Sequence, residues 1–327
     1  MAPNLCLNEI MLIIILLLLV SLVILTFGAN YLVKGSSNLA LRCGLTPLAV
    51  GLTVVAFGTS SPELIVSLKA ALANQGDIAV GNVVGSNIFN IAFILGLTAL
   101  ICPMKVENQI IKVDLPIMIG VGLFGAYFLM DGQLTRLEGI IFFLSIIGYT
   151  IFTYFLARKT HNAALDKDYA GSMPKDLGKL WSNVLMIIGG LALLVLGGKI
   201  LVENAVALAR ILGMSEALIG LTIVAAGTSM PELATSIVAA FKKEPEIAIG
   251  NIVGSNIFNI LLILGLSATV QPMSFPGIQT SDLVVMLIFS LVLLPLMATN
   301  FQLKRWEGAA LFLGYGIYLY SVWPQAK

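Results

Sequence analysis

Charged residues are scarce in this chain. Lys, Arg, Asp and Glu make up 11% of its 327 residues, whereas 58% are hydrophobic and the mean hydropathy is +1.00. So few charges cannot cover the surface of a soluble domain of this length. The composition therefore excludes a soluble protein and indicates an integral membrane protein, with the lipid bilayer as its solvent.

Histidine and cysteine are nearly absent as well. His161 is the only histidine and lies in a polar stretch, which argues against zinc or proton-relay chemistry built on imidazole. The three cysteines, Cys6, Cys43 and Cys102, are odd in number and lack metal-binding spacing. They predict neither a disulfide framework nor a metal site, so we expect ordinary packing roles for them and no bound cofactor.

Motifs of ATP-driven pumps and of metalloproteases are missing too. The sequence contains no Gly-rich phosphate loop, no phosphorylatable Asp motif of an ion-pumping ATPase and no His-Glu-x-x-His motif. We expect no nucleotide or nucleic-acid partner, and an intramembrane enzyme is the least favoured class. Energy for any uphill transport would come from an ion gradient or from a partner subunit.

Long apolar segments dominate the sequence instead. A membrane-crossing helix needs about 20 apolar residues, and the first segment lacks the basic start and the cleavage site of a signal peptide. We find ten such segments, centred near Ile15, Val55, Ile91, Ile119, Leu144, Leu191, Ile223, Ile260, Leu287 and Leu313. The predicted fold is an all-α integral membrane protein with ten transmembrane helices.

The chain contains two copies of one unit. Residues 50–98 reappear 169 positions later as residues 219–267, without a gap and with 30 of 49 positions identical. The sequence divides into a first five-helix repeat (1–157), a cytoplasmic linker (158–180) and a second five-helix repeat (181–327). An odd number of crossings per repeat makes the second copy enter from the opposite side, which predicts inverted topology with broken helices at the centre.

The basic residues predict the orientation, because Lys and Arg remain on the cytoplasmic side of short loops. With the N-terminus outside, 13 of the 18 basic residues fall in cytoplasmic connections. The other five fall outside or at helix ends, namely Lys69, Arg136, Lys199, Arg210 and Lys327. We therefore predict a multi-pass protein of the plasma or inner membrane, functional as a monomer, with both termini outside.

Two carboxylates lie in the repeated blocks Gly-Thr-Ser-x-Pro-Glu, at residues 58–63 and 227–232. Glu63 and Glu232 have no Lys or Arg within their motifs. An unpaired carboxylate within a membrane costs at least about 2.5 kcal/mol, so a bound cation or a proton must compensate each one. At helical spacing, Thr59 shares a face with Glu63, as Thr228 does with Glu232.

Further oxygen donors accompany these carboxylates. Pro62 and Pro231 remove a backbone donor, which leaves the carbonyls of Gly58 and Gly227 free to join a ligand set. The second pair of blocks, Gly-Asn-x-x-Gly-Ser-Asn, supplies a helical stripe of Asn82, Ser86 and Asn90, repeated by Asn251, Ser255 and Asn259. Such hard oxygens suit Ca²⁺ or Na⁺ and disfavour zinc, copper or iron. One Ca²⁺, two Na⁺ or two protons would each balance the site charge of −2, as mutually exclusive exchange requires.

Structural roles compete for several of these residues. Small residues at helix interfaces commonly serve close packing, and membrane-embedded Asn side chains often join helices by hydrogen bonds. Four glycines, Gly81, Gly85, Gly250 and Gly254, form small-xxx-small pairs. For these glycines we expect tight helix packing around the site rather than ligation.

With these two motifs, the sequence resembles the cation/Ca²⁺ antiporter superfamily, in its bacterial and archaeal branch related to Na⁺/Ca²⁺ exchangers. The resemblance covers the whole chain in helix count and repeat layout. It implies a cluster of cation sites lined by Thr59, Ser60, Glu63, Ser86, Asn90, Thr228, Ser229, Glu232, Ser255 and Asn259, with backbone carbonyls of Ala56 and Ala225 binding Na⁺. It also implies that the first and sixth helices, which end near Val33 and Val202, slide across the rest to alternate access.

One position departs from this family pattern. Well-studied Na⁺/Ca²⁺ exchangers have an aspartate where this chain has Asn259. The site is therefore symmetric with Asn90 and has one titratable group fewer. This substitution leaves the choice among Na⁺, K⁺ and H⁺ as the driving ion open.

These features predict a secondary antiporter that exchanges Ca²⁺ for Na⁺ by alternating access at a central two-glutamate site. Ca²⁺ and a monovalent cation would be its substrates. The close rival is Ca²⁺/H⁺ antiport, with the same glutamates as proton carriers. A passive cation channel is also compatible with an oxygen-lined path, although the paired broken helices argue against it.

Overall fold

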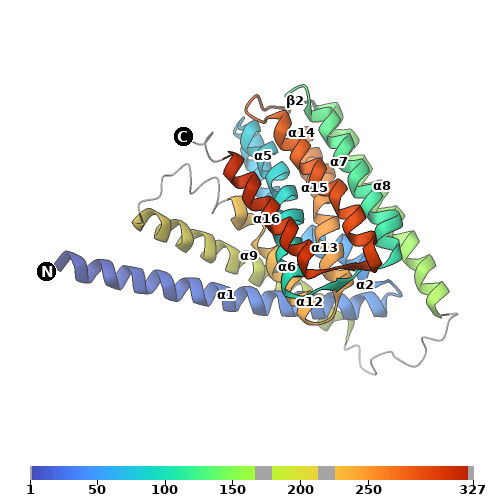
Figure 1. Ribbon diagram of the computed structural model, residues 1–327, viewed down its shortest axis with the longest axis horizontal. Helices are drawn as coiled ribbons and strands as arrows, with labels where there is room; N and C mark the ends of the chain where they lie inside the picture. Colours follow the sequence, from blue (N-terminus) through green and yellow to red (C-terminus); the bar gives the residue numbers. More distant parts are fainter. Residues whose placement is uncertain (1, 166–178, 213–224, 323–327) are drawn as a thin grey trace.

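The computed structural model describes residues 2–165, 179–212 and 225–322, and these are mostly helical (Figure 1). The first repeat contains α1 (Ala2–Arg42), α2 (Pro47–Val50), η1 (Gly51–Val55), α3 (Ala56–Thr59), α4 (Ser61–Leu72), α5 (Gly76–Ile88), η2 (Phe89–Leu95), α6 (Gly96–Ile101), β1 (Met104–Lys105), η3 (Ile110–Asp114), α7 (Leu115–Leu129), β2 (Gln133–Leu134) and α8 (Arg136–Leu165). The second contains α9 (Leu180–Ile211), α11 (Ala225–Thr228), α12 (Met230–Phe241), α13 (Pro245–Phe258), η6 (Asn259–Leu264), α14 (Gly265–Val270), β3 (Met273–Ser274), α15 (Thr280–Ala298), η7 (Thr299–Phe301), β4 (Gln302–Leu303) and α16 (Arg305–Val322).

Helices that can cross a membrane make up most of the described chain. Seven segments are long and apolar enough, and an eighth arises if residues 47–59 and 61–72, which meet at 46°, form one bent span. The seven segments cover residues 10–42, 76–101, 110–129, 136–159, 180–211, 245–270 and 280–301. The protein is therefore a helical, multi-span membrane protein, as the composition predicts.

Most of the predicted segment centres lie in these helices. The seven spans contain seven of the ten centres, Val55 lies in the bent pair and Leu313 lies in α16. The remaining centre, Ile223, falls outside the described residues. The number of ten crossings therefore stays a prediction.

Three details differ from the sequence interpretation. Helices α1 and α9 end at Arg42 and Ile211, about nine residues beyond the expected ends near Val33 and Val202, because the polar residues after these positions continue the helical turns. Helix α8 continues to Leu165, past the predicted end of the first repeat at residue 157. Ala163, Ala164 and Leu165 are strong helix formers, which explains the extension, and residues 166–178 of the predicted linker lie outside the described ranges. Lys199, which we assigned to the outside or a helix end, lies in the body of α9, because this helix is 32 residues long.

The long helices α1 and α9 pack against each other in opposite directions. Gly28 of α1 lies against Gly190 of α9, whereas Gly35 further along α1 lies against Asn183, which comes earlier in α9. A Cβ atom on Gly28 would lie 2.9 Å from the Gly190 carbonyl oxygen, so this close approach requires glycine. In Figure 1 the two helices lie side by side at the edge of the bundle, and the N-terminal part of α1 extends beyond it.

Short connections gather in two separate sets, each combining both repeats. In one set, β2 pairs with β3, Gln271 donates to Asn74 and the Gly277 amide donates to Asp77. In the other, β1 pairs with β4, and Ser37 donates to Glu244. We call these the 271–282 face and the 102–109 face, after one connection in each. Pairing of the repeats at both faces holds them together around one centre.

The core lies around α13 and α5, which carry the second pair of motif blocks. Every residue of α13 from Ile247 to Phe258 is buried. In the spans that contain α13 and α5, 94% and 72% of the most apolar window is buried, against 17% for α1 and 28% for α8, α9 and α15. The motif helices are thus central, and the outer helices face the lipid.

Candidate cation-binding site

Each Gly-Thr-Ser-x-Pro-Glu block forms a break between two short helices. In the first repeat α3 ends at Thr59 and α4 starts at Ser61, with Ser60 between them at φ −80° and ψ 6°. In the second repeat Ser229 separates α11 from α12 at φ −89° and ψ 10°. The proline in each first turn has no N–H to continue the preceding helix, which explains why both breaks fall here. Glu63 and Glu232 therefore each lie in the first turn of a new helix.

The two glutamates are fully buried, and each is held by a serine of the other repeat. The Ser229 hydroxyl donates to Glu63 Oε1 at 2.9 Å, and the Ser60 hydroxyl donates to Glu232 Oε1 at 3.0 Å. The carboxylates lie close enough to interact electrostatically. The structure thus brings Glu63, Glu232, Ser60 and Ser229 together, as the sequence predicts.

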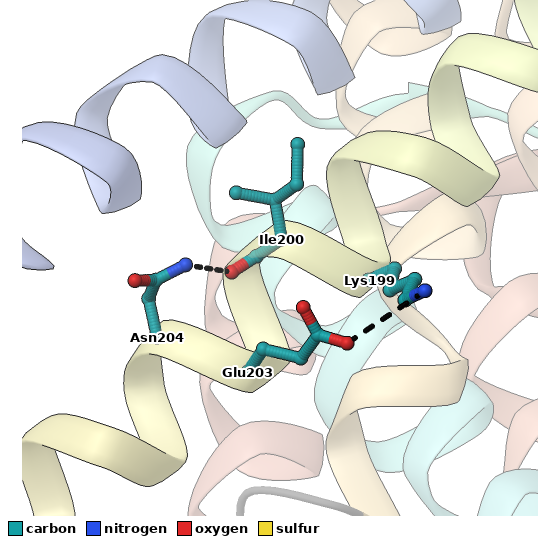
Figure 2. Close-up of polar contacts among 4 residues, drawn as sticks. All are labelled: Lys199, Ile200, Glu203 and Asn204. Carbon is teal, nitrogen blue, oxygen red and sulfur yellow. Dashed lines mark hydrogen bonds and ion pairs between the residues drawn. The ribbon is translucent and has the colours of Figure 1, made fainter.

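Several oxygen atoms at this centre have no hydrogen-bond donor. The second carboxylate oxygen of each glutamate is buried and unpartnered, and so are the amide oxygens of Asn90 and Asn259. An ion pair joins Lys199 and Glu203, 3.8 Å apart on an exposed part of α9, and none recorded between described residues includes Glu63 or Glu232. Figure 2 shows these two side chains on α9, beside the Asn204 amide that bonds the Ile200 carbonyl. No described basic side chain therefore neutralises the buried carboxylates.

Two further asparagines orient the amides of Asn90 and Asn259. The Asn259 Nδ2 donates to Asn87 Oδ1 at 2.9 Å, and the Asn90 Nδ2 donates to Asn256 Oδ1 at 3.3 Å. These bonds hold the two nitrogens, so the amide oxygens remain available to a cation. The sequence reasoning missed the roles of Asn87 and Asn256, because they lie off the helical stripe and act between the repeats.

The first residue of each predicted stripe, Asn82 or Asn251, has a different role. Asn82 donates to the Glu63 carbonyl oxygen and to Ser67, and Asn251 donates to the Glu232 carbonyl oxygen and to Ser236. Thr59 donates to Asn251 Oδ1 at 3.0 Å. These contacts fix the backbone that carries each glutamate, so Asn82 and Asn251 are positioning residues.

The remaining predicted residues also lie near the glutamates. Thr59 and Ser255 neighbour the Glu232 carboxylate, Thr228 neighbours that of Glu63, and Ser86 lies 3.4 Å from the Ser229 hydroxyl. The carbonyl of Ala56 accepts the Ser60 amide at 3.0 Å, while Ala225 begins α11. The candidate ligands thus converge from α3–α4, α5–η2, α11–α12 and α13–η6.

Widened helical turns lie next to several candidate ligands in the chain. The π-helical segment η6 begins at Asn259, η2 covers Asn90, and η1 ends directly before Ala56. Such π-helical turns shift the i→i−4 pairing of backbone groups and are frequent at functional sites. They set the direction in which the following side chains point.

Glycines allow α13 to approach the first repeat closely. A Cβ on Gly254 would lie 2.5 Å from the Leu52 carbonyl oxygen, and one on Gly250 would lie 3.0 Å from the Leu48 carbonyl oxygen. The packing role expected of these two glycines is confirmed. For Gly81 and Gly85 the packing prediction is wrong. A Cβ on Gly81 would meet Ile278 at an ordinary 3.4 Å, no described atom lies within 4 Å of one on Gly85, and both residues line a cavity.

The donor set of this centre is chemically uniform. Carboxylate, amide and hydroxyl oxygens are the ligands that hard cations prefer. The described residues contain no group of three or more His, Cys, Asp or Glu side chains placed to hold a metal ion. The centre therefore combines two carboxylates with neutral oxygens, which suits a cation that is bound and released.

The fold and this centre define a class: a multi-span membrane protein whose two repeats meet at a buried, oxygen-rich core. Similarity to known proteins specifies it further. The sodium/calcium exchanger protein family matches residues 13–155 and 182–323. Among its relatives, the putative antiporter CaxA of Alkalimonas amylolytica is 40% identical over 95% of this chain and all of its own length. The sodium/calcium exchanger MaX1 of Methanosarcina acetivorans is 35% identical over 93% and 97% of the two chains.

A solved structure of the sodium-calcium exchanger NCX_Mj has a similar fold. It superposes with a TM-score of 0.81 at 28% identity, covering 95% of this chain and 99% of its own. The chain belongs to the sodium/calcium exchanger family.

Proposed function

We propose that this protein is a secondary antiporter that exchanges Ca²⁺ for Na⁺ at the centre formed by Glu63 and Glu232. The observation that carries the proposal is the pair of fully buried carboxylates, each with one oxygen unpartnered and without an ion pair to any described basic side chain. Burying such charges is strongly unfavourable unless a cation or a proton compensates them. The names of CaxA and MaX1 support transport over an enzymatic role.

The ligands follow from the geometry around the two glutamates. Ca²⁺ would bind between the carboxylates, and the oxygens of Asn90 and Asn259 would complete its shell together with the nearby hydroxyls. Those hydroxyls belong to Thr59, Ser60, Ser86, Thr228, Ser229 and Ser255. The carbonyls of Ala56 and Ala225 would add ligands for Na⁺. Ca²⁺ or two Na⁺ would each neutralise the centre, so either load would permit the conformational change.

The proposed architecture is an inverted pair of five-helix repeats. The antiparallel packing of α1 and α9 supports it, because these helices are the corresponding first members of the two repeats. In this arrangement α1 and α9 would slide across the remaining helices to open the centre to each face in turn. One chain holds all the proposed ligands, so a monomer would suffice.

The 102–109 face would lie in the cytoplasm, with both termini and the 271–282 face outside, at a plasma or inner membrane. Lys34 and Lys242 support this orientation, since basic residues prefer the cytoplasmic side. Burial and the charge of the neighbouring Lys34 lower the pKa of Lys242, while Glu244 opposes the shift. The linker around residues 158–180 would then also be cytoplasmic.

Ca²⁺/H⁺ exchange remains the second candidate, and Asn259 is the residue that favours it. With an amide at this position, the centre contains two carboxylates, which two protons could neutralise as well as two Na⁺.

Ca²⁺ uptake into proteoliposomes loaded in turn with Na⁺, K⁺ or a pH-jumped buffer separates the candidates. Each load is compared with an equal external solution. Uptake driven by an outward Na⁺ gradient alone is the expected result. Uptake driven by protons alone would instead establish the second candidate, and uptake without any counter-ion would indicate a channel.

A further inference from the structure

A cavity of about 200 Å³ lies between α5, α15 and α16. Asn82 and Ser86 line one part of it, and Asp282, Tyr315 and Tyr318 line another. Among its described lining residues, Asp282 is the only charged one. The rest of the lining is mostly apolar, so the cavity has one carboxylate, located at the start of α15, and a few neutral polar groups.

Ser86 connects this cavity to the buried glutamates. Its side chain is only 2% exposed, and its hydroxyl oxygen lies 3.4 Å from Ser229 Oγ. Ser229 in turn bonds Glu63 Oε1 at 2.9 Å. Two serine hydroxyls, those of Ser86 and Ser229, therefore link the cavity to Glu63.

The Asp282 carboxylate is held in place by two neutral donors. The Tyr318 hydroxyl donates to Oδ1 at 3.3 Å, and the backbone amide of Gln279 donates to Oδ2 at 3.3 Å. The second bond belongs to a capping box, in which an uncharged Gln would serve as well. Neither donor cancels the negative charge, and a fixed charge in a confined space attracts ions of opposite sign.

The repeat symmetry gives this acid a buried counterpart. Asp282, Leu283 and Met286 correspond to Asp114, Leu115 and Met118, with one residue fewer between the motif and this helix in the second repeat. The contacts agree, because Asn87 donates to the Met286 sulfur as Asn256 does to the Met118 sulfur. Asp114 is 1% exposed and accepts a bond from Gln109, whereas Asp282 is half-buried and lines the cavity. Asp282 therefore belongs to the 271–282 face, and its counterpart Asp114 begins the helix at the 102–109 face.

We propose that Asp282, oriented by Tyr318, is a docking site for a hydrated cation on its way to the central glutamates. The inference rests on the proposed exchange function and adds to it a binding step at one face of the protein, the 271–282 face. One carboxylate and one hydroxyl cannot replace the six to eight oxygen ligands of Ca²⁺, so the docked ion keeps most of its water. Docking raises the local concentration of the cation at the 271–282 face without changing the central site.

The test measures Ca²⁺ transport by the full-length protein in proteoliposomes, with the KM for Ca²⁺ determined separately at each face. In Asp282→Asn, we expect the KM for Ca²⁺ at the 271–282 face to rise about three- to tenfold at low ionic strength. The maximal rate and the KM at the opposite face stay unchanged. Added choline chloride shrinks the difference between wild type and variant, because salt screens the charge. Asp282→Glu keeps the charge and is expected to resemble the wild type.

Glu138→Gln is the matched control. Glu138 is also a half-buried acid in the first turn of a helix, and its Oε2 accepts the Thr135 amide at 2.7 Å. It lies at the start of α8, so its neutralisation leaves the KM unchanged at both faces. If Asp282→Asn does not give monodisperse protein, Asp282→Gln provides a second uncharged variant that retains the capping oxygen.

The docking role is wrong if the uncharged Asp282 variant keeps the wild-type KM, shifts KM equally at both faces, or only lowers the maximal rate. A wild-type protein without any counter-ion-dependent Ca²⁺ uptake would contradict the exchange function itself. The two failures are distinguishable, because only the second appears in the wild type.

Discussion

At the scale of single residues, the centre depends on which oxygens are already bonded. One oxygen of each glutamate accepts a serine hydroxyl from the other repeat, and the second oxygen has no donor. The amides of Asn90 and Asn259 show the same division between a bonded nitrogen and an unpartnered oxygen. The bonded atoms fix the geometry, and the unpartnered oxygens are the ones that a cation could bind.

Removing either negative charge tests this division. We expect Glu63→Gln and Glu232→Gln each to lower Ca²⁺ uptake about 30-fold or more, since truncating one partner of a buried charge pair costs about 2–5 kcal/mol. Thermal stability of the ion-free protein should be equal or higher, because a buried unpaired charge is removed. Uptake of radioactive Ca²⁺ and a fluorescence-detected melting curve measure the two effects.

Glu307→Gln is the control for this pair of variants. Glu307 is also fully buried and has an unpartnered Oε1, but its Oε2 accepts the Lys304 amide and it lies in α16. Its replacement should leave Ca²⁺ uptake at the wild-type level. Normal uptake by both central variants would show that the site lies elsewhere.

The sequence predicted those residues of the centre that stand out chemically. Glutamates in apolar helices are expensive, and their duplication with Ser60 and Ser229 marks one site in two copies. Asn87 and Asn256 were missed as site residues, because counting along a helix groups residues of one face. Their contacts cross between the repeats, and such distances depend on how the helices pack.

At the scale of elements, the positions of the helix breaks were predictable but their shape was not. Pro62 and Pro231 lack the amide hydrogen that would continue a helix, so breaks before them follow from the chain itself. The wide turns of η2 and η6 contain ordinary apolar residues after Asn90 and Asn259. No local signal marks them, because such turns depend on the tertiary packing around them.

Close packing of α13 against the first repeat predicts a sensitive position at Gly254. In Gly254→Ala the new Cβ would meet the Leu52 carbonyl oxygen at 2.5 Å and the Ala56 Cβ at 2.7 Å. We expect a loss of about 1–3 kcal/mol in stability from overpacking. A lower Na⁺ affinity should accompany it, since the segment that carries the Ala56 carbonyl must shift. Melting curves with and without Na⁺ measure both effects.

Gly148→Ala in α8 is the comparison for this substitution. No described atom lies within 4 Å of a Cβ built on Gly148. Alanine favours helix over glycine, so this variant should be at least as stable as the wild type. Equal stability of Gly254→Ala and Gly148→Ala would mean that α13 does not need its close approach.

At the scale of the whole molecule, the two sets of connections predict which residues face each side. Cys43 follows α1, is exposed and belongs to the predicted cytoplasmic side. A variant that retains only this cysteine should react with a membrane-impermeant maleimide in inside-out vesicles alone. Asp131→Cys in a cysteine-free chain should react in right-side-out vesicles alone. Labelling of both from one side would contradict the proposed orientation.

Charge balance of the complete transport cycle predicts its electrical behaviour. The centre contains two carboxylates, and one Ca²⁺ neutralises them as fully as two Na⁺ or two protons. Both half-cycles then carry the same net charge, so exchange should be electroneutral. A potential of 100 mV acts on each uncompensated charge with about 2.3 kcal/mol. A K⁺ diffusion potential of about that size, set with valinomycin, should therefore leave the rate of Ca²⁺ uptake unchanged in the wild type.

Asn259→Asp should make Ca²⁺ uptake depend on the membrane potential. A third carboxylate makes a three-Na⁺ load neutral but leaves the Ca²⁺ load with one negative charge, so uptake becomes sensitive to the potential. The new carboxylate has no N–H to donate to Asn87 Oδ1, so the Asn87 amide would rotate to offer its nitrogen instead. Asn259→Ser adds no charge and should remain insensitive. Potential-dependent uptake by the wild type would mean that the transported charge is not set by Glu63 and Glu232 alone.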